Sequence, residues 1–241
     1  MPARNDWAAV FDVDGTLLPK KAGALWKVVD DHALPEEANA EMIELRERFT
    51  PMAVGGNLPE RIQMLWLRKT FDIYVKHRLT RQAWQTAIDA VMPREGAVDA
   101  LLEIVQAGIP FGAISYGCAD FIEYLFQRHG VRFDAVYAGR LVHDGDVVVG
   151  YDLASLVIPA HKGERSRHFA DIHEVPHEKL IGVGDTGGDQ LLGHLKEHRI
   201  GIVETEKQHE ELRKIDAMGE IHVTETFHPV LASIKKRIGL P

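Results

Sequence analysis

The sequence predicts an α/β fold in which a parallel sheet lies between two layers of helices, and three observations carry this prediction. From residue 96 onward, short apolar runs alternate with amphipathic helical patterns, which indicates repeated strand–helix units. Residues 20–92 show helical patterns only, so we expect an inserted, all-helical segment. Polar side chains follow directly after several expected strands, at the edge where parallel sheets bind their ligands.

The first expected strand covers residues 8–12, and the helical segment follows it. The run AAVF at 8–11 is apolar at every position, as in a buried strand. Further on, EEANAEMIELRERF and PERIQMLWLRKTFDIYVKHRL place apolar residues at helical spacing. Prolines and the GGN at 55–57 separate these patterns, so we expect several helices rather than one.

After residue 96 the expected elements alternate. AVDALLEIVQAG predicts a helix closed by a glycine, IPFGAIS predicts a buried strand, and CADFIEYLFQRHG predicts a second helix. VYAGRLVHDGDVVVGYD alternates on both sides of DGD and predicts a β-hairpin. The tail predicts strands at KLIGVGD, RIGIV and EIHVT, with helices at GDQLLGHLKEH, over 206–217 and at the C-terminus.

Composition excludes several classes of protein. The net charge of −8 argues against a protein that binds nucleic-acid backbones. No stretch reaches the ~20 apolar residues of a membrane span, and the N-terminal apolar run is too short for a secretory signal. The single cysteine, Cys118, cannot form an intrachain disulfide, which favours a cytoplasmic location. Acidic residues are concentrated outside residues 19–95, so an anionic substrate would require a metal and a few well-placed cations.

The first candidate cluster follows the first strand and contains Asp12, Asp14, Gly15 and Thr16. Two carboxylates on a glycine-opened turn suit Mg²⁺, which binds a few hard oxygens and keeps room for water and phosphate. A calcium-binding loop is excluded, because its sixth and twelfth positions are not the glycine and glutamate that such a loop needs. The alternative is a strand end capped by its own backbone.

Two further clusters predict contacts to an anion. Ser115, Tyr116 and Gly117 follow the strand IPFGAIS, and a hydroxyl with consecutive backbone N–H groups can bind phosphate. Lys162 begins a helical pattern, where a cation is unfavourable unless an anion neutralises it. The alternatives are an ordinary turn and a solvated lysine.

The fourth cluster is IGVGDTGGDQ, in which Asp185 ends a strand and Asp189 follows after two glycines. Because the strand ends of a parallel sheet share one edge, these two acids are expected beside Asp12 and Asp14 as further metal ligands. The assembled chemistry is phosphoryl transfer. Asp12 would attack the phosphorus and Asp14 would act as general acid and base. Ser115, Lys162 and the Gly117 amide would hold the phosphoryl oxygens.

In order along the chain, FDVDGTL (11–17), Ser115, Lys162 and GDTGGD (184–189) resemble the four motifs of the haloacid dehalogenase-like superfamily. The resemblance implies a Rossmann-like core formed by residues 1–19 and 93–241, with a helical C1 cap over 20–92. It implies Asp12 as nucleophile, Asp14 as general acid/base, and phosphate contacts from Thr16, Ser115, Tyr116, Gly117 and Lys162. It also implies Mg²⁺ bound by Asp12, the Asp14 carbonyl and Asp185, with Asp189 assisting.

Two branches of the superfamily are similar to this chain. LRERFTPM, Trp66, REGAVDALLE and GDTGGD resemble the cytosolic pyrimidine 5′-nucleotidases, which implies that Glu47 and Trp66 face a nucleotide. The alternative for Trp66 is that it belongs to the cap's own core. AHKGE and the hairpin GRLVHDGDVVVG instead resemble phosphoserine phosphatases. Lys20 would either contact the anionic end of the substrate or remain solvated.

The expected function is a Mg²⁺-dependent phosphomonoesterase that hydrolyses a small phosphorylated metabolite through an aspartyl-phosphate, with a nucleoside 5′-monophosphate as one candidate. The alternatives are a phosphoserine-type phosphatase, a phosphotransferase or mutase, and a non-catalytic binding protein. Binding proteins on this fold lose an aspartate or the lysine of the motifs, whereas this chain keeps all of them.

Overall fold

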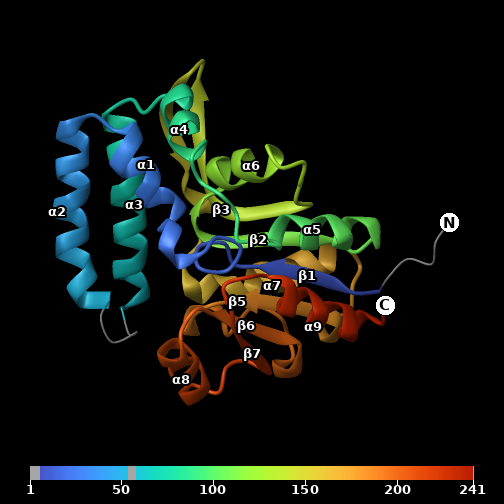
Figure 1. The fold of residues 1–241 in the computed structure, drawn as a ribbon. Helices are drawn as coiled ribbons and strands as arrows, with labels where there is room; N and C mark the ends of the chain where they lie inside the picture. Colours follow the sequence, from blue (N-terminus) through green and yellow to red (C-terminus); the bar gives the residue numbers. More distant parts are fainter. Residues whose placement is uncertain (1–5, 54–57, 241) are drawn as a thin grey trace.

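The computed structural model describes residues 6–53 and 58–240, and a seven-stranded sheet lies at its centre (Figure 1). The strand order is β4-β3-β2-β1-β5-β6-β7, and all neighbouring strands are parallel except β3 and β4. The strands are β1 (Ala8–Phe11), β2 (Phe111–Cys118), β3 (Ala135–Asp144), β4 (Val147–Asp152), β5 (Leu180–Gly184), β6 (Arg199–Val203) and β7 (Glu220–Val223). The predicted α/β class and the hairpin at β3 and β4 are confirmed.

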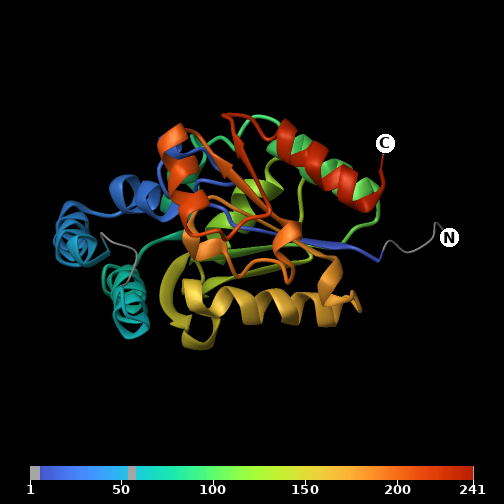
Figure 2. The same ribbon diagram turned by 90° about the horizontal axis from the view of Figure 1, so that it is seen from below.

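Helices cover both faces of this sheet (Figure 2). On one face lie α5 (Ala97–Gln106), α6 (Ala119–Gln127) and α9 (His228–Ile238), and α7 (Lys162–Ile172) lies on the other. The remaining helix of this part, α8 (Glu206–Lys214), packs against β6 and β7.

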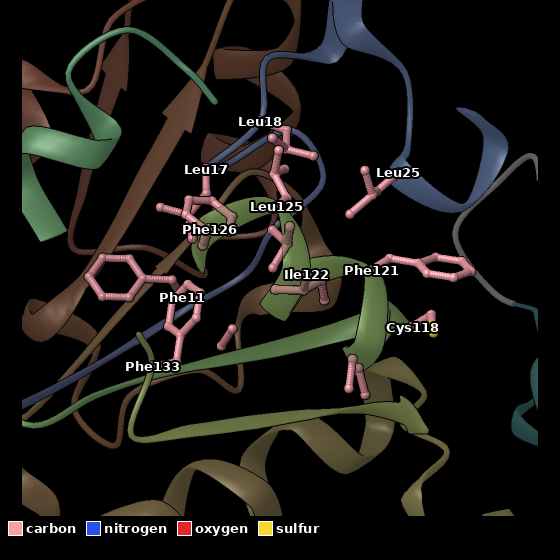
Figure 3. Packing of buried hydrophobic residues seen from close by; sticks show 14 of the residues in the cluster. Phe11, Leu17, Leu18, Leu25, Cys118, Phe121, Ile122, Leu125, Phe126 and Phe133 are labelled. Carbon is pink, nitrogen blue, oxygen red and sulfur yellow. The ribbon is translucent and has the colours of Figure 1, made fainter. Parts of the chain in front are cut away.

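Strand β1 is apolar at every position because each of its faces contacts a different hydrophobic cluster. Ala9 and Phe11 belong to the larger cluster, in which Phe11 lies among side chains of α6 and the loop after β1 (Figure 3). Ala8 and Val10 pack in a second cluster with Phe169 of α7. Burial on both faces is what a central strand of a parallel sheet requires.

Among the described residues, four α-helices lie between β1 and α5 in the sequence and stand to one side of the sheet (Figure 1). They are α1 (Leu25–Ala33), α2 (Glu36–Ala53), α3 (Glu60–Lys76) and α4 (Arg81–Ile88). The long helices α2 and α3 pack against each other, α1 packs on α4, and α3 and α4 reach the core at β4 and α6. This segment carries the helices that the pattern of residues 20–92 predicts.

The prediction of a helix at GDQLLGHLKEH (188–198) is wrong. The structure has a short 3-10 turn at Gly187–Asp189, followed by turns and bends and a second 3-10 turn at Lys196–His198. Gly193 has a positive φ of 75° and lies against the backbone of β5, where an added Cβ would be 2.9 Å from the Gly182 nitrogen. The chain therefore folds tightly over β5, and this close backbone contact outweighs the helical pattern.

Candidate active site

All four sequence clusters meet around one cavity of about 390 Å³ beyond the carboxyl ends of β1, β2 and β5. The start of α7 closes one side of this cavity, and the helical segment contributes another. Among the described residues, its lining consists of Asp12, Asp14, Ala24, Trp26, Leu58, Gln63, Trp66, Ser115, Tyr116, Pro159, Lys162, Asp185, Thr186 and Gly188.

Lys162 joins the two ends of the acidic cluster. Its Nζ donates to Asp12 Oδ1 at 2.6 Å and to Asp189 Oδ1 at 2.5 Å, and all three side chains are buried. Burial raises the pKa of Asp12, and the charge of Lys162 opposes this rise. Burial also works against the charge of Lys162, but attraction by Asp12 and Asp189 outweighs it and raises the pKa of the lysine. Lys162 therefore remains an ammonium group beside Asp12.

Asp189 is held by the turn that carries it. Its Oδ2 accepts hydrogen bonds from the Asp185 and Thr186 amides at 3.1 and 2.9 Å, and from Thr186 Oγ1 at 2.9 Å. The neighbouring glycines are needed for space, since a Cβ on Gly184 would lie 2.2 Å from that of Asp189. The side chain is therefore fixed with Oδ1 toward Lys162.

Asp185 lies against the glycine of the first cluster. An added Cβ on Gly15, which has a positive φ of 89°, would lie 2.4 Å from Asp185 Oδ2. The same oxygen is 2.8 Å from Lys20 Nζ. Burial, together with the charge of Asp189, raises the pKa of Asp185 to about 6 against the effect of Lys20. Lys20, predicted as a substrate contact, thus pairs with an acid of the cluster.

Asp14 lies at the cavity, but its carboxylate is directed to the helical segment. Its Oδ1 accepts a hydrogen bond of 2.8 Å from the Leu25 amide at the start of α1. Burial raises the pKa of Asp14 to about 6, while this hydrogen bond lowers it. A carboxyl group with this pKa can exchange a proton near neutral pH.

Of the residues predicted to bind phosphate, Thr16 and Lys162 contact Asp12, and Ser115 and Tyr116 line the same cavity. Thr16 Oγ1 donates to Asp12 Oδ2 at 3.3 Å, and the Gly117 amide donates to Ser115 Oγ at 3.2 Å. Strand β2 runs to Cys118, so Ser115, Tyr116 and Gly117 lie in the irregular end of this strand. They do not form the helix start that the sequence predicted. The Tyr116 hydroxyl instead donates to the Gln63 carbonyl of α3 at 2.7 Å, which joins β2 to the helical segment.

Three buried carboxylates form the part of this site that could hold a metal. Ligand oxygens of Asp12, Asp185 and Asp189 lie within 4.8 Å of one another. Hard carboxylate oxygens are the donors that Mg²⁺ prefers. Lys162 and Lys20 offset two of these three negative charges and leave one for a cation. A divalent cation therefore fits the donor set, although the nearby ammonium groups repel it. The Asp14 side chain is outside this group of oxygens.

The helical segment presents aromatic side chains to the cavity. Trp66 lines the cavity and stacks on Phe49, with ring centroids 5.8 Å apart and an angle of 11° between the planes. Trp26 lines it as well, and both indoles also border a small adjoining recess of about 20 Å³. Glu47, on α2, is exposed and outside the described lining.

Sequence reasoning missed three residues of this region: Trp26, Arg94 and Glu204. Trp26 follows the first cluster by only ten residues. In KKAGALW it belongs to no apolar pattern of helical or strand spacing, so nothing in the local sequence marked it. Arg94 belongs to the REGAVDALLE motif, but a single arginine before an expected helix carries no local signal of burial or of distant partners. Glu204 directly follows β6, so the rule that polar residues at strand ends gather at one edge could have found it.

Fold and site together define an α/β enzyme core whose acidic centre lies at the carboxyl edge of a parallel sheet. The sequence matches the haloacid dehalogenase-like hydrolase family over residues 9–194, and the chain belongs to this family. The resemblance based on the four motifs is thereby confirmed, as is the hydrolase class. A search of curated proteins finds none that matches this chain.

Solved structures with the same fold cover nearly the whole chain. Cytosolic 5′-nucleotidase IIIB bound to cytidine has a TM-score of 0.78 at 14% identity, covering 97% of this chain and 86% of that one. A phospho-aspartyl intermediate analogue of phosphoserine phosphatase has a TM-score of 0.67 at 20% identity, covering 95% and 99%. A HAD family hydrolase from Salmonella enterica subsp. enterica serovar Typhi has a TM-score of 0.69 at 16% identity, covering 97% and 72%.

Among the described residues, no helix combines the length and apolar character that crossing a membrane requires.

Proposed function

We propose that this protein is a Mg²⁺-dependent phosphomonoesterase that hydrolyses a nucleoside 5′-monophosphate through an aspartyl-phosphate on Asp12. The observation that carries the proposal is the contact of the Lys162 ammonium with Asp12 Oδ1 at 2.6 Å, beside Asp185 and Asp189. A carboxylate attacks a phosphate dianion only where positive charge offsets the repulsion between them. We further propose that residues 1–19 and 93–241 form the catalytic core, that 20–92 select the substrate, and that the enzyme works in the cytoplasm.

In the first step, Asp12 attacks the phosphorus and the bond from phosphorus to the ester oxygen breaks. Asp14, with a pKa near 6, gives its proton to the leaving oxygen. Ser115, Thr16 and Lys162 hold the phosphoryl oxygens as their charge redistributes. In the second step, Asp14 takes a proton from water, the water oxygen attacks the phosphorus, and Asp12 is released.

Asp12, Asp185 and the Asp14 carbonyl would hold Mg²⁺, with Asp189 assisting. When bound, Mg²⁺ supplies positive charge that neutralises the carboxylates and the phosphate together. The buried oxygen cluster supports this assignment.

The side of the cavity that the helical segment forms supports the proposed substrate class. Its described lining residues are Ala24, Trp26, Leu58, Gln63 and Trp66, all of which are uncharged. A planar, uncharged nucleobase can pack on indole rings, whereas the ammonium and carboxylate of phosphoserine require charged partners. The solved structure of the nucleotidase bound to cytidine agrees with this preference.

The test is phosphate release from nucleoside monophosphates, phosphoserine, sugar phosphates and an aryl phosphate, with Mg²⁺ or with EDTA. The variants are Asp12→Asn and, as a matched control, Asp171→Asn, whose side chain is exposed on α7. We expect Mg²⁺-dependent turnover that Asp12→Asn abolishes and Asp171→Asn keeps, with nucleoside monophosphates as the best substrates.

Each other result contradicts a defined part of the proposal. If phosphoserine were the best substrate, the proposed substrate class would be wrong, but the proposed phosphatase activity would stand. Transfer of phosphate to an added alcohol in preference to water would favour a phosphotransferase. Absence of turnover over the whole panel, with a folded wild-type protein, would overturn the enzymatic proposal in favour of a binding protein.

A further inference from the structure

Arg94 is a fully buried arginine, and the acceptors of its side-chain hydrogen bonds all belong to loops around the candidate site. It lies before α5, where the chain returns from the helical segment to the sheet, and it is 2% exposed. Its side chain does not belong to the described lining of the cavity. Burial of a guanidinium is costly unless its donors are satisfied, so its partners indicate what it does.

All five N–H donors of the guanidinium have acceptors. Nε donates to the Thr16 carbonyl at 2.8 Å, and Nη2 donates to the Gly15 carbonyl at 2.6 Å and to Glu204 Oε1 at 3.0 Å. Nη1 donates to the carbonyls of residues 224 and 225 at 3.3 and 3.2 Å. A lysine offers three donors from one point, so it cannot satisfy this set of acceptors.

These acceptors belong to the loops that follow β1, β6 and β7, on the same edge of the sheet. The loop after β1 has the most contacts, because the backbone amide of Arg94 also donates to the Leu17 carbonyl at 2.8 Å. Three consecutive carbonyls, of residues 15, 16 and 17, therefore accept hydrogen bonds from one residue. Gly15 has broad conformational freedom, and such external contacts are what fix the peptide planes around it.

Glu204 extends this arrangement to the other connection of the helical segment. Its Oε1 accepts from Arg94 Nη2 and also from the backbone amide of Lys20 at 2.8 Å. Lys20 lies where the chain leaves the core toward α1, and Arg94 lies where it returns. One carboxylate thus holds both connections between the sheet and the helical segment.

We propose that Arg94, with Glu204, is a positioning residue that sets the backbone geometry of residues 12–17 and couples it to the placement of the helical segment. The proposal rests on the proposed phosphatase function, since it concerns the loop that carries Asp12 and Asp14. Arg94 touches neither the cavity nor the reacting atoms, so its effect is expected in turnover rather than in substrate binding.

The test compares Arg94→Lys and Glu204→Gln with Arg199→Lys. Arg199 is a matched control, because its guanidinium also donates to backbone carbonyls, at residues 193, 194 and 217, but from the start of β6 at the opposite end of that strand. The measurements are kcat and KM on an aryl phosphate, thermal unfolding, and hydrogen exchange of the Thr16 and Leu18 amides. Both amides donate to the Val13 carbonyl and report on the loop directly.

For Arg94→Lys we expect kcat to fall about tenfold to a hundredfold while KM stays within about threefold, because a misplaced nucleophile slows chemistry without removing a substrate contact. Glu204→Gln, which keeps the shape and loses the charge, is expected to show a smaller loss in the same direction. Exchange at Thr16 and Leu18 should become faster in Arg94→Lys and remain unchanged in Arg199→Lys.

Equal losses of kcat in Arg94→Lys and Arg199→Lys would overturn the proposal, because both substitutions would then lower activity by destabilising the fold in general. Unchanged kcat in folded Glu204→Gln and Arg94→Lys would do the same. An inactive wild-type protein would contradict the proposed phosphatase alone, since the exchange measurement still decides whether Arg94 orders the loop.

Discussion

The ammonium of Lys20 lies 2.8 Å from Asp185 Oδ2, and the backbone amide of the same lysine is bound by Glu204. Lys20, at the start of the helical segment, thereby forms an ion pair with Asp185, one of the three clustered carboxylates. Lys21, the next residue, instead pairs at 3.4 Å with Glu225 on the surface, where its side chain is 74% exposed. The two lysines differ in environment and not in chemistry, which makes them a matched pair.

Replacement of Lys20 by methionine is expected to strengthen divalent cation binding. The ammonium and a cation at Asp185 repel each other, so removal of this charge should lower the Mg²⁺ concentration for half-maximal activity roughly threefold to tenfold. Titration calorimetry with Mg²⁺ measures the same change without substrate. Lys21→Met should leave both values as in the wild type, and weaker Mg²⁺ binding by Lys20→Met would contradict the expectation.

Asp14→Asn is expected to separate the two steps of the reaction. Loss of the general acid and base should lower kcat by about 10²- to 10⁴-fold on an alkyl phosphate. A nitrophenolate leaves without a proton, so rapid mixing with the nitrophenyl ester should give a burst of nitrophenolate followed by slow turnover. Asp12→Asn, which lacks the proposed nucleophile, should give no burst. A burst of equal size in both variants would argue against these roles.

The indoles at the cavity are expected to contribute to the KM for nucleotides. Trp26→Leu and Trp66→Leu should each raise the KM for a nucleoside monophosphate about threefold to tenfold, the range of a lost aromatic contact. The KM for ribose 5-phosphate should change little, because this substrate has no base. Trp84→Leu is the control, since Trp84 is buried against Phe121 and Tyr124 and lies outside the cavity. A rise in KM for both substrates would indicate damage to the phosphate site.

The helical segment contains a buried acid whose effect on stability depends on pH. Burial raises the pKa of Asp30 from 3.8 to about 7, although the Tyr74 hydroxyl donates to it at 2.7 Å and Arg46 lies 3.7 Å away. Between these two pKa values the folded protein binds more protons than the unfolded chain, so Asp30 makes the fold less stable as the pH rises.

Asp30→Asn should therefore stabilise the protein more at pH 8 than at pH 5, by roughly 1–3 kcal/mol, since one pKa unit corresponds to about 1.4 kcal/mol. Urea unfolding at both pH values measures this difference. The neighbouring Asp31 provides a control of opposite sign. Burial tends to raise its pKa, but hydrogen bonds from Lys27 and Arg46 lower it overall. Asp31→Asn should cost stability at pH 8 and less as the pH falls, and equal effects of both variants would refute the assignment.

Local patterns along the chain were sufficient for the fold class and for most of the site. The run at 8–11 indicates a strand buried on both faces, and Asp12, Ser115 and Asp185 follow or end apolar runs. Because parallel strands end at one edge, these positions alone predict that the side chains meet. The same local information failed at 188–198, where a helical pattern is overridden by the contact of Gly193 with β5.

The sequence predicts a parallel sheet with an acidic, phosphate-directed centre and a helical segment that interrupts it, because periodicity and strand ends report burial and direction. The distant residues that complete the centre become visible in the folded protein alone. Arg94 and Glu204 are 110 positions apart, and Lys20 and Glu204 are 184 apart. Their contacts depend on how loops and helices pack around the sheet, and no spacing along one segment encodes a contact between two loops.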